Sequence, residues 1–297
     1  MTSEKRSRRR RFRASGMMAG NKDLLWLLLW LGGIIVMGVW LALFLNAPAR
    51  ALVEQAFANT LYGAVGVVAF ALLMGWAVAL MLHALESARR RTPYLVLMFL
   101  LNLLRSVPQM VGMLIGYALI TGLVRREALP STASQILLTS VITAVFVFQE
   151  VVDLILERIR HYEHLEFYNA LLVCGVPPRV IINREILLKN SLAHIVQKSV
   201  ALFGRAIFLI CSIDFIISVG LSTEVSLSNL PVTLGSMLAK LDSKQDILVI
   251  GTAFTDPRII GTLLFEHLQG ISIAFLIVYT LMCVYRIANG LMERYRL

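Results

Sequence analysis

Long apolar runs separated by short polar segments dominate the chain. Six runs are long enough, at about 20 residues or more, to cross a hydrocarbon layer of about 30 Å as a helix. Because the bilayer core admits helices but not irregular lipid-exposed backbone, the pattern predicts an all-α integral membrane protein with about six transmembrane helices. The runs cover residues 24–45, 60–84, 94–123, 135–155, 193–220 and 262–285.

The bulk composition also favours a membrane protein. Of the 297 residues, 58% are hydrophobic and 15% are charged, whereas a soluble domain has about 45–50% apolar and about 25% charged residues. The first apolar run exceeds the roughly 7–15 residues of a signal-peptide core, so we expect a retained span. The spacing of Cys174, Cys211 and Cys283 predicts neither a disulfide framework nor a metal site.

The basic residues predict the orientation of the spans. If the N-terminus is cytoplasmic and the spans alternate, 20 Lys and Arg residues fall in inside segments and six in outside segments. Because basic residues are retained on the cytoplasmic side, this asymmetry predicts that both termini are cytoplasmic. The basic residues that give the chain its net charge of +10 lie mostly beside the spans. We therefore expect them to contact the lipid bilayer and not to bind nucleic acid.

The predicted organisation has four parts. They are a basic cytoplasmic tail (1–23), a first span with a short outer loop (24–58), a core of five spans (59–285) and a cytoplasmic tail (286–297). Two polar segments interrupt the core, at 156–192 inside and at 221–260 outside. In the outside segment, LPVTLGSMLAKL has apolar residues at helical spacing and predicts a short amphipathic helix over the outer mouth.

The inside segment 156–192 predicts a helix, a turn and a second helix. Gly175 permits a C-terminal turn after EFYNALLVC, and Pro177–Pro178 end one helix and open the next. An apolar ridge on the second helix needs a protein groove, on a partner or on the protein's own bundle. At α-helical spacing this ridge consists of Val180, Ile181, Leu187 and Leu188.

These residues resemble the EAA loop of binding-protein-dependent ABC transporter permeases. That loop opens with Glu-Ala-Ala, continues with a glycine and ends in an apolar-Leu-Pro sequence. Here Asn169-Ala170-Leu171 stands at the opening, Gly175 at the glycine and Ile186-Leu187-Leu188 at the ending. Asn169, Leu171 and Leu188 depart from the pattern, and Glu166 matches a glutamate that precedes the motif in the peptide-type branch.

Further stretches extend the resemblance over about residues 59–285. Asn59–Leu80 is similar to the Asn-Thr-Leu opening of the core span, and Leu104–Gly116 is similar to the third span with its Arg-Ser-x-Pro sequence. Asp214–Leu221 and Leu234–Leu241 are similar to two elements of the dipeptide/oligopeptide/nickel branch, with a leucine in place of the tryptophan of the second.

The resemblance implies a type I ABC importer permease in a bacterial cytoplasmic (inner) membrane. Such a subunit forms part of the pathway for a solute, here a peptide or a related small solute, which an extracytoplasmic solute-binding protein delivers. The departures from the loop pattern indicate either a divergent family member or a subunit that pairs with a better-conforming partner, and our hypothesis is a heterodimer with a second permease subunit.

The resemblance also implies that Asn169–Leu188 couples to cytoplasmic ABC ATPase subunits. The chain has no GxxxxGK[ST] phosphate loop, so we expect the partner subunits to bind ATP and Mg²⁺. We expect no catalytic residue, metal or cofactor in this chain, which would not itself be an enzyme. The candidate coupling residues are Glu166, Asn169, Ala170, Gly175, Pro177, Arg179, Ile186, Leu187 and Leu188.

Ionisable side chains inside the predicted spans are further candidates, because such groups face protein or water. Arg105, Pro108 and Asp214 are candidates for the pathway or its gate. Alternatively, Arg105 forms a structural ion pair with an acid such as Asp214 or Glu150, or reaches an interface. The remaining ionisable groups in the spans are His83, Asp153 and Arg205. Glu150 and Asp153 lie one helical turn apart, a spacing that would also suit a proton relay.

Two other functions share parts of this pattern. An ATPase-driven complex that exports a solute or signals would have the same sequence features, and co-purification with a binding protein would distinguish the importer. An ATP-independent channel or secondary transporter predicts internal repeats with broken helices, and neither is apparent in the sequence.

Overall fold

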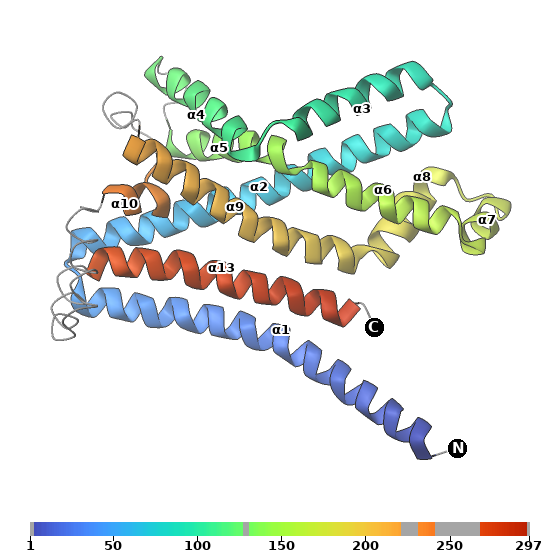
Figure 1. The fold of residues 1–297 in the computed structure, drawn as a ribbon, viewed down its shortest axis with the longest axis horizontal. Helices are drawn as coiled ribbons and strands as arrows, with labels where there is room; N and C mark the ends of the chain where they lie inside the picture. The colour runs from blue at the N-terminus through green and yellow to red at the C-terminus, as the bar shows by residue number, and fades with distance from the viewer. Residues whose placement is uncertain (1–2, 127–130, 221–230, 241–267, 296–297) are drawn as a thin grey trace.

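The computed structural model describes residues 3–126, 131–220, 231–240 and 268–295, which form helices and no strand. Four long helices run lengthwise through the molecule (Figure 1). They are α1 (Ser3–Phe44), α2 (Ala47–Ser87), α9 (Leu192–Gly220) and α13 (Leu268–Tyr295). The shorter elements are α3 (Arg91–Ser106), α4 (Gln109–Arg125), α5 (Thr132–Val147), α6 (Gln149–Glu163), α7 (Glu166–Val173), α8 (Pro178–Val180), the π-helix η1 (Ile181–Asn190) and α10 (Leu234–Lys240).

The helices include four to six candidate membrane spans. By length and composition, α2, α9, α13 and the apolar part of α1 can each cross a membrane. The pairs α3–α4 and α5–α6 meet the same criterion as spans bent by 93° and 50°. The expectation of an all-helical multi-pass protein is therefore confirmed, and two of its spans are broken although no break was apparent in the sequence.

The sharper bend has a local cause at Pro108. The residue before a proline is driven out of the helical region by contact with the proline ring. Val107 accordingly adopts φ −82° and ψ 122°, which ends α3, and α4 starts directly after the proline. The bend between α5 and α6 has neither proline nor glycine within the turn around Phe148 and Gln149. No sequence signal therefore marks this second break.

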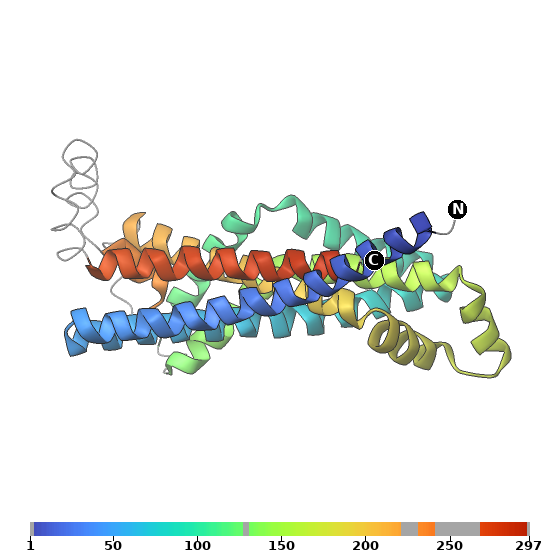
Figure 2. The same ribbon diagram turned by 90° about the horizontal axis from the view of Figure 1, so that it is seen from below.

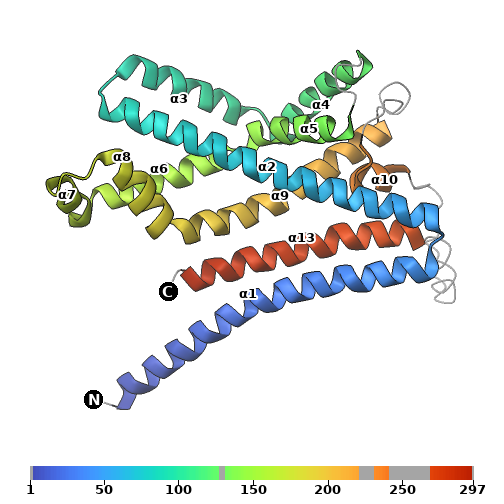
Figure 3. The ribbon, with the colours of Figure 1, turned by 180° about the vertical axis from the view of Figure 1, so that it is seen from behind.

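Both ends of the chain lie at one end of the bundle. In Figures 1 and 3, the start of α1, the α2–α3 turn, α7 and the end of α13 share this end. We call it the terminal end. The α1–α2 turn, α10 and the start of α13 lie at the opposite end. Most of the predicted outside segment 221–260 falls outside the described residues, but α10 confirms a short helix within LPVTLGSMLAKL.

Helix α2 lies at the centre of the bundle and packs through small side chains. Gly63, Gly66 and Gly75 approach α9, α5 and α6 so closely that an added Cβ would lie 3.2 Å or less from a neighbouring side chain. Such small residues let membrane helices pack backbone to backbone. The buried face of α2 comprises Val53, Ala56, Thr60, Gly63, Ala64, Val67, Ala71, Gly75, Ala79 and Leu82.

Helix α1 packs mainly along α13 (Figure 2). The indole N–H of Trp30 donates to the Thr280 hydroxyl at 3.3 Å, and the Tyr279 hydroxyl donates to the Leu29 carbonyl. Gly33 leaves room for the Tyr279 ring. Helix α13 stays helical to Tyr295, so the tail predicted to begin at residue 286 is largely a continuation of the last helix.

Candidate functional site

The predicted coupling segment projects from the terminal end and consists of two short α-helices followed by a π-helix. We call Glu166–Asn190, which comprises α7, α8 and η1, the α7–η1 arm. Figure 2 shows that α7 lies at the tip of the molecule, beyond the ends of α2 and α9. No side chain of α7 is buried, so this helix contributes little to the core of its own chain.

The turn after α7 has the geometry predicted for Gly175. This residue has φ +79°, the left-handed region that glycine adopts without strain. The Val176 N–H donates to the Leu171 carbonyl at 3.1 Å and the Gly175 N–H to the Leu172 carbonyl at 3.0 Å, which together form a Schellman motif. Pro178 then occupies the first position of α8, as predicted.

The apolar ridge predicted on the second helix does not match the face that is buried in the structure. Ile181 and Leu187 are buried in the bundle core, whereas Val180 and Leu188 are exposed. The reason is that residues 181–190 form a π-helix, in which residues five apart share a face. The buried face therefore consists of the pairs Ile181–Ile186 and Ile182–Leu187, while the sequence argument assumed α-helical spacing.

The candidate coupling residues consequently divide into two groups. Ile186 and Leu187 are buried and fasten η1 to the bundle. The other group is exposed and available to a partner: Glu166, Asn169, Ala170, Gly175, Pro177, Arg179 and Leu188. Close to this group lie the exposed Val180 of the predicted ridge and three exposed apolar side chains that the sequence argument did not single out, Phe167, Leu172 and Val173.

Polar contacts attach the arm to α2 and α6. The indole N–H of Trp76 in α2 donates to the side-chain oxygen of Asn183 at 3.0 Å. The Tyr162 hydroxyl in α6 donates to the Asn190 carbonyl at 3.5 Å. Partial burial raises the pKa of the Tyr168 phenol, and the Glu163 carboxylate raises this pKa further, so this side of α7 faces α6.

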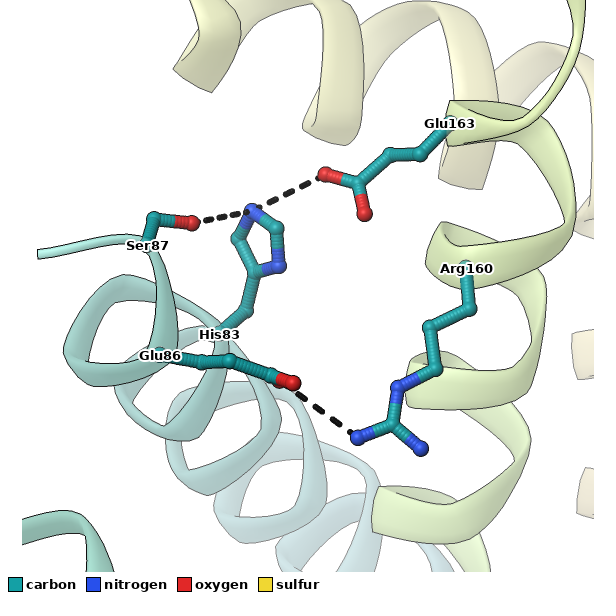
Figure 4. Close-up of polar contacts among 5 residues, drawn as sticks. All are labelled: His83, Glu86, Ser87, Arg160 and Glu163. Atoms are coloured by element: carbon teal, nitrogen blue, oxygen red, sulfur yellow. Dashed lines mark hydrogen bonds and ion pairs between the residues drawn. The ribbon is translucent and has the colours of Figure 1, made fainter. Parts of the chain in front are cut away.

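A group of polar contacts joins the ends of α2 and α6 just before the arm (Figure 4). The ring of His83 lies 3.3 Å from a Glu163 carboxylate oxygen and 3.5 Å from the Ser87 hydroxyl. Arg160 pairs with Glu86 at 3.4 Å. The residues lie on facing turns of the two helices and join the end of α6, directly before the arm, to the end of α2.

Arg105 pairs with a different acid from those expected. Its guanidinium donates to the Asp153 carboxylate, across the two bends that follow α3 and precede α6. Asp214 and Glu150, the predicted partners, do not contact it in the described structure. At the same level, the side-chain amide of Gln109 donates to the Phe146 carbonyl at 3.2 Å, which satisfies a backbone acceptor beside the second bend.

Glu150 forms a second charged group with α9. Its carboxylate lies 2.6 Å from the Lys198 ammonium and also pairs with the Arg205 guanidinium. The sequence argument did not single out Lys198, so its role in this group was missed. The i, i+7 spacing of Lys198 and Arg205 places both on one face of α9.

Asp214 lies apart from Arg105, at the opposite end, where it holds α10. The Thr233 hydroxyl donates to its buried carboxylate. The next backbone N–H, of Leu234, donates to the Thr60 hydroxyl at 3.1 Å, and the Asn59 amide donates to the Val232 carbonyl at 2.9 Å. Three stretches noted separately in the sequence, beginning at Asn59, Asp214 and Leu234, therefore meet in one contact.

No metal site is present among the described residues, because no group of three or more His, Cys, Asp or Glu side chains has a suitable arrangement. The cysteines are free thiols, with Cys174 exposed on the arm and Cys211 and Cys283 buried.

No protein-family model matches the chain, and no curated protein sequence matches it.

Proposed function

We propose that this chain is a permease subunit of an ATP-driven transporter and that the α7–η1 arm binds a separate ATPase subunit. Helix α7 is the observation that carries this proposal, because none of its eight residues is buried. Phe167, Leu172 and Val173 expose apolar surface at the tip of a membrane bundle, and the exposed fraction of Val173 is 88%. Apolar side chains on an exposed helix are stabilised by a groove on a partner.

The attachment of the arm supports a role in force transmission. Ile186 and Leu187 bury the base of the arm in the core, Trp76 connects the arm to α2, and Tyr162 connects it to α6. A partner that moves α7 therefore acts on the central helix of the bundle. Rigid-body movement of packed helices is a common route to alternating access.

The basic residues favour a cytoplasmic terminal end. Arg89, Arg90 and Arg91 lie in the α2–α3 turn, and Arg179 and Arg184 lie in the arm, all at this end. Because basic residues are retained in the cytoplasm, the arm would meet a cytoplasmic ATPase. The solute, a peptide or a related small solute, would come from a binding protein at the opposite side, and a second permease subunit would complete the pathway.

Substitution of Val173 by glutamate tests this proposal. A carboxylate in the docking groove would be desolvated, so the Val173→Glu variant should insert in the membrane normally but lose the ATPase subunit during purification. Ala88→Glu is the matched control, because Ala88 is exposed at the same end but outside the arm. Retention of the ATPase by both variants would show that α7 is not the docking element.

The two bent spans favour a second candidate, an ATP-independent transporter. Broken helices beside intramembrane charges are typical of secondary transporters. Vesicles that contain the chain and accumulate solute under an ion gradient without ATP would establish this candidate. Uptake that needs ATP and a co-purified ATPase would support the permease subunit, and a bound solute-binding protein would favour import over export or signalling.

A further inference from the structure

Charged side chains from three helices, α3, α6 and α9, pair with one another beside the two bends. Arg105 follows 14 residues after the start of α3 and stands beside the bend to α4. Glu150 and Asp153 follow the bend between α5 and α6. Arg205 is the fourteenth of the 29 residues of α9. At a rise of about 1.5 Å per residue, Arg105 and Arg205 lie roughly 20 Å along the helix from its terminal-end start.

Together with Lys198, these side chains form one cluster with unequal charges. Arg105 pairs with Asp153, while Glu150 is shared between Lys198 and Arg205. The cluster thus contains three cations and two carboxylates. One positive charge is left without a full counterion, and such a charge is costly in a low-dielectric region.

The cluster is accessible from the surface of the chain. The side chain of Asp153 is 60% exposed, that of Arg205 44% and that of Arg105 40%. Charged groups at this depth do not face lipid, and broken helices are tolerated only beside protein or water. We therefore expect water around these side chains.

A cavity of about 480 Å³ extends from the Arg105–Asp153 pair of the cluster toward the terminal end. Arg105 and Asp153 line its deep part, and Glu157, His161 and His164 follow along α6 toward the end of that helix. Leu101 and neighbouring apolar side chains of α2 and α3 line the other wall. One charged wall makes the cavity unsuitable for a lipid chain, and its volume is in the range of small-molecule sites.

We propose that the anionic group of the transported solute, a carboxylate or a group of similar charge, binds to Arg105, which lines the cavity, and to Lys198 and Arg205, which complete the cluster beside it. The bound anion supplies the counterion that the cluster lacks. Arg205 and Lys198 share Glu150 and therefore have donors left for a second acceptor. This inference rests on the proposed transport function, and it adds the charge of the solute and the residues that meet it.

Thiol labelling with charged reagents tests the sign of the cluster. A cysteine at Asn102, an exposed residue one turn before Arg105, reports on the site in membranes that hold the assembled complex, with Cys174→Ser as background. The reagents are the anionic sulfonatoethyl and the cationic trimethylammonioethyl methanethiosulfonates, each rate normalised to that with a free thiol. We expect the anionic reagent to react about tenfold faster, as a unit charge nearby dictates.

Variants of the cluster and of the surroundings complete the test. Arg205→Gln or Lys198→Gln should make the normalised rates of the anionic and cationic reagents nearly equal. Either variant is enough for this test, provided that it accumulates normally in the membrane. Arg50→Gln removes an equal charge at the opposite end and should leave the preference intact. Phe99→Cys, on the exposed apolar face of α3, should react with neither reagent.

Three results would overturn the inference: no reaction at Asn102→Cys, equal rates for the two reagents, or a preference for the cation. The labelling needs neither ATP nor nucleotide hydrolysis. It therefore gives an answer independent of the Val173→Glu experiment, and a failure of one proposal can be told from a failure of the other.

Discussion

Gly235 of α10 lies directly against the backbone of Cys211 in α9, so that an added Cβ would come within 2.1 Å of the Cys211 carbonyl oxygen. The neighbour is backbone and has little freedom to move aside. Together with the hydrogen bonds that Thr233 and Leu234 donate, this contact fixes α10 to the end of the bundle that lies opposite the terminal end.

Gly235→Ala should therefore displace α10. Overpacking of this kind costs about 1–3 kcal/mol, and the effect should appear as faster hydrogen exchange of the α10 amides together with a lower melting temperature. Gly38→Ala is the control, because an added Cβ at Gly38 meets nothing within 4 Å. Unchanged exchange in Gly235→Ala would mean that α10 does not pack on α9 in this way.

Thr60→Val should loosen the same contact from the side of α2. The substitution keeps the shape of a buried side chain but removes the acceptor of the Leu234 N–H. A buried donor without an acceptor costs about 1–3 kcal/mol. Thr139→Val makes the same chemical change where the hydroxyl donates to the Gln135 carbonyl of its own helix. Denaturant unfolding in detergent should show a larger loss for Thr60→Val, and equal losses would contradict the contact.

Gly175→Ala and Gly175→Arg should leave the protein in the membrane but impair coupling to the ATPase. An added Cβ at Gly175 meets nothing within 4 Å, so the penalty comes from the backbone at φ +79°. It amounts to about 1–2 kcal/mol for an ordinary residue. Gly175→Asn is the control, because asparagine adopts this conformation more easily. The measurement is solute-stimulated ATP hydrolysis by the complex, and full stimulation in Gly175→Arg would count against docking through the arm.

Labelling of the native Cys174 should reveal the orientation of the chain. This thiol is exposed on the arm, whereas Cys211 and Cys283 are buried. A membrane-impermeant maleimide should label the protein in inside-out vesicles and leave it unlabelled in right-side-out vesicles. The opposite pattern would place the terminal end outside the cell and would remove the basis for a cytoplasmic ATPase.

Much of the fold could be predicted because its signals are local. Runs of apolar residues indicated each helical span, and Gly175 with Pro177–Pro178 indicated the turn in the arm through the conformations that these residues prefer. Pro108 was singled out only as a candidate for the pathway or its gate. The hydropathy of residues 94–123 nevertheless continues across it, so a bend of 93° leaves no trace in an average over the run.

The rest could not be predicted because it depends on distant contacts or on an uncommon helix type. The choice of Asp153 rather than Glu150 as partner of Arg105 depends on how two bends meet in space. The buried face of η1 depends on a π-helical repeat, and no feature of the sequence IINREILLKN indicates such a repeat. The contact between Thr60 and Leu234 joins residues 174 positions apart in the chain.

The length of α2 has a mechanical consequence. This helix is fastened near one end to α10, through Asn59 and Thr60, and near the other to the arm and α6, through Trp76 and His83. The separation of 24 positions between Asn59 and His83 corresponds to about 36 Å of rigid helix. A tilt of about 10° around the middle of this length would carry its two ends roughly 3 Å in opposite directions. A rotation of helix α2 about the glycines and alanines that pack it in the bundle core would therefore couple the movements of its two ends.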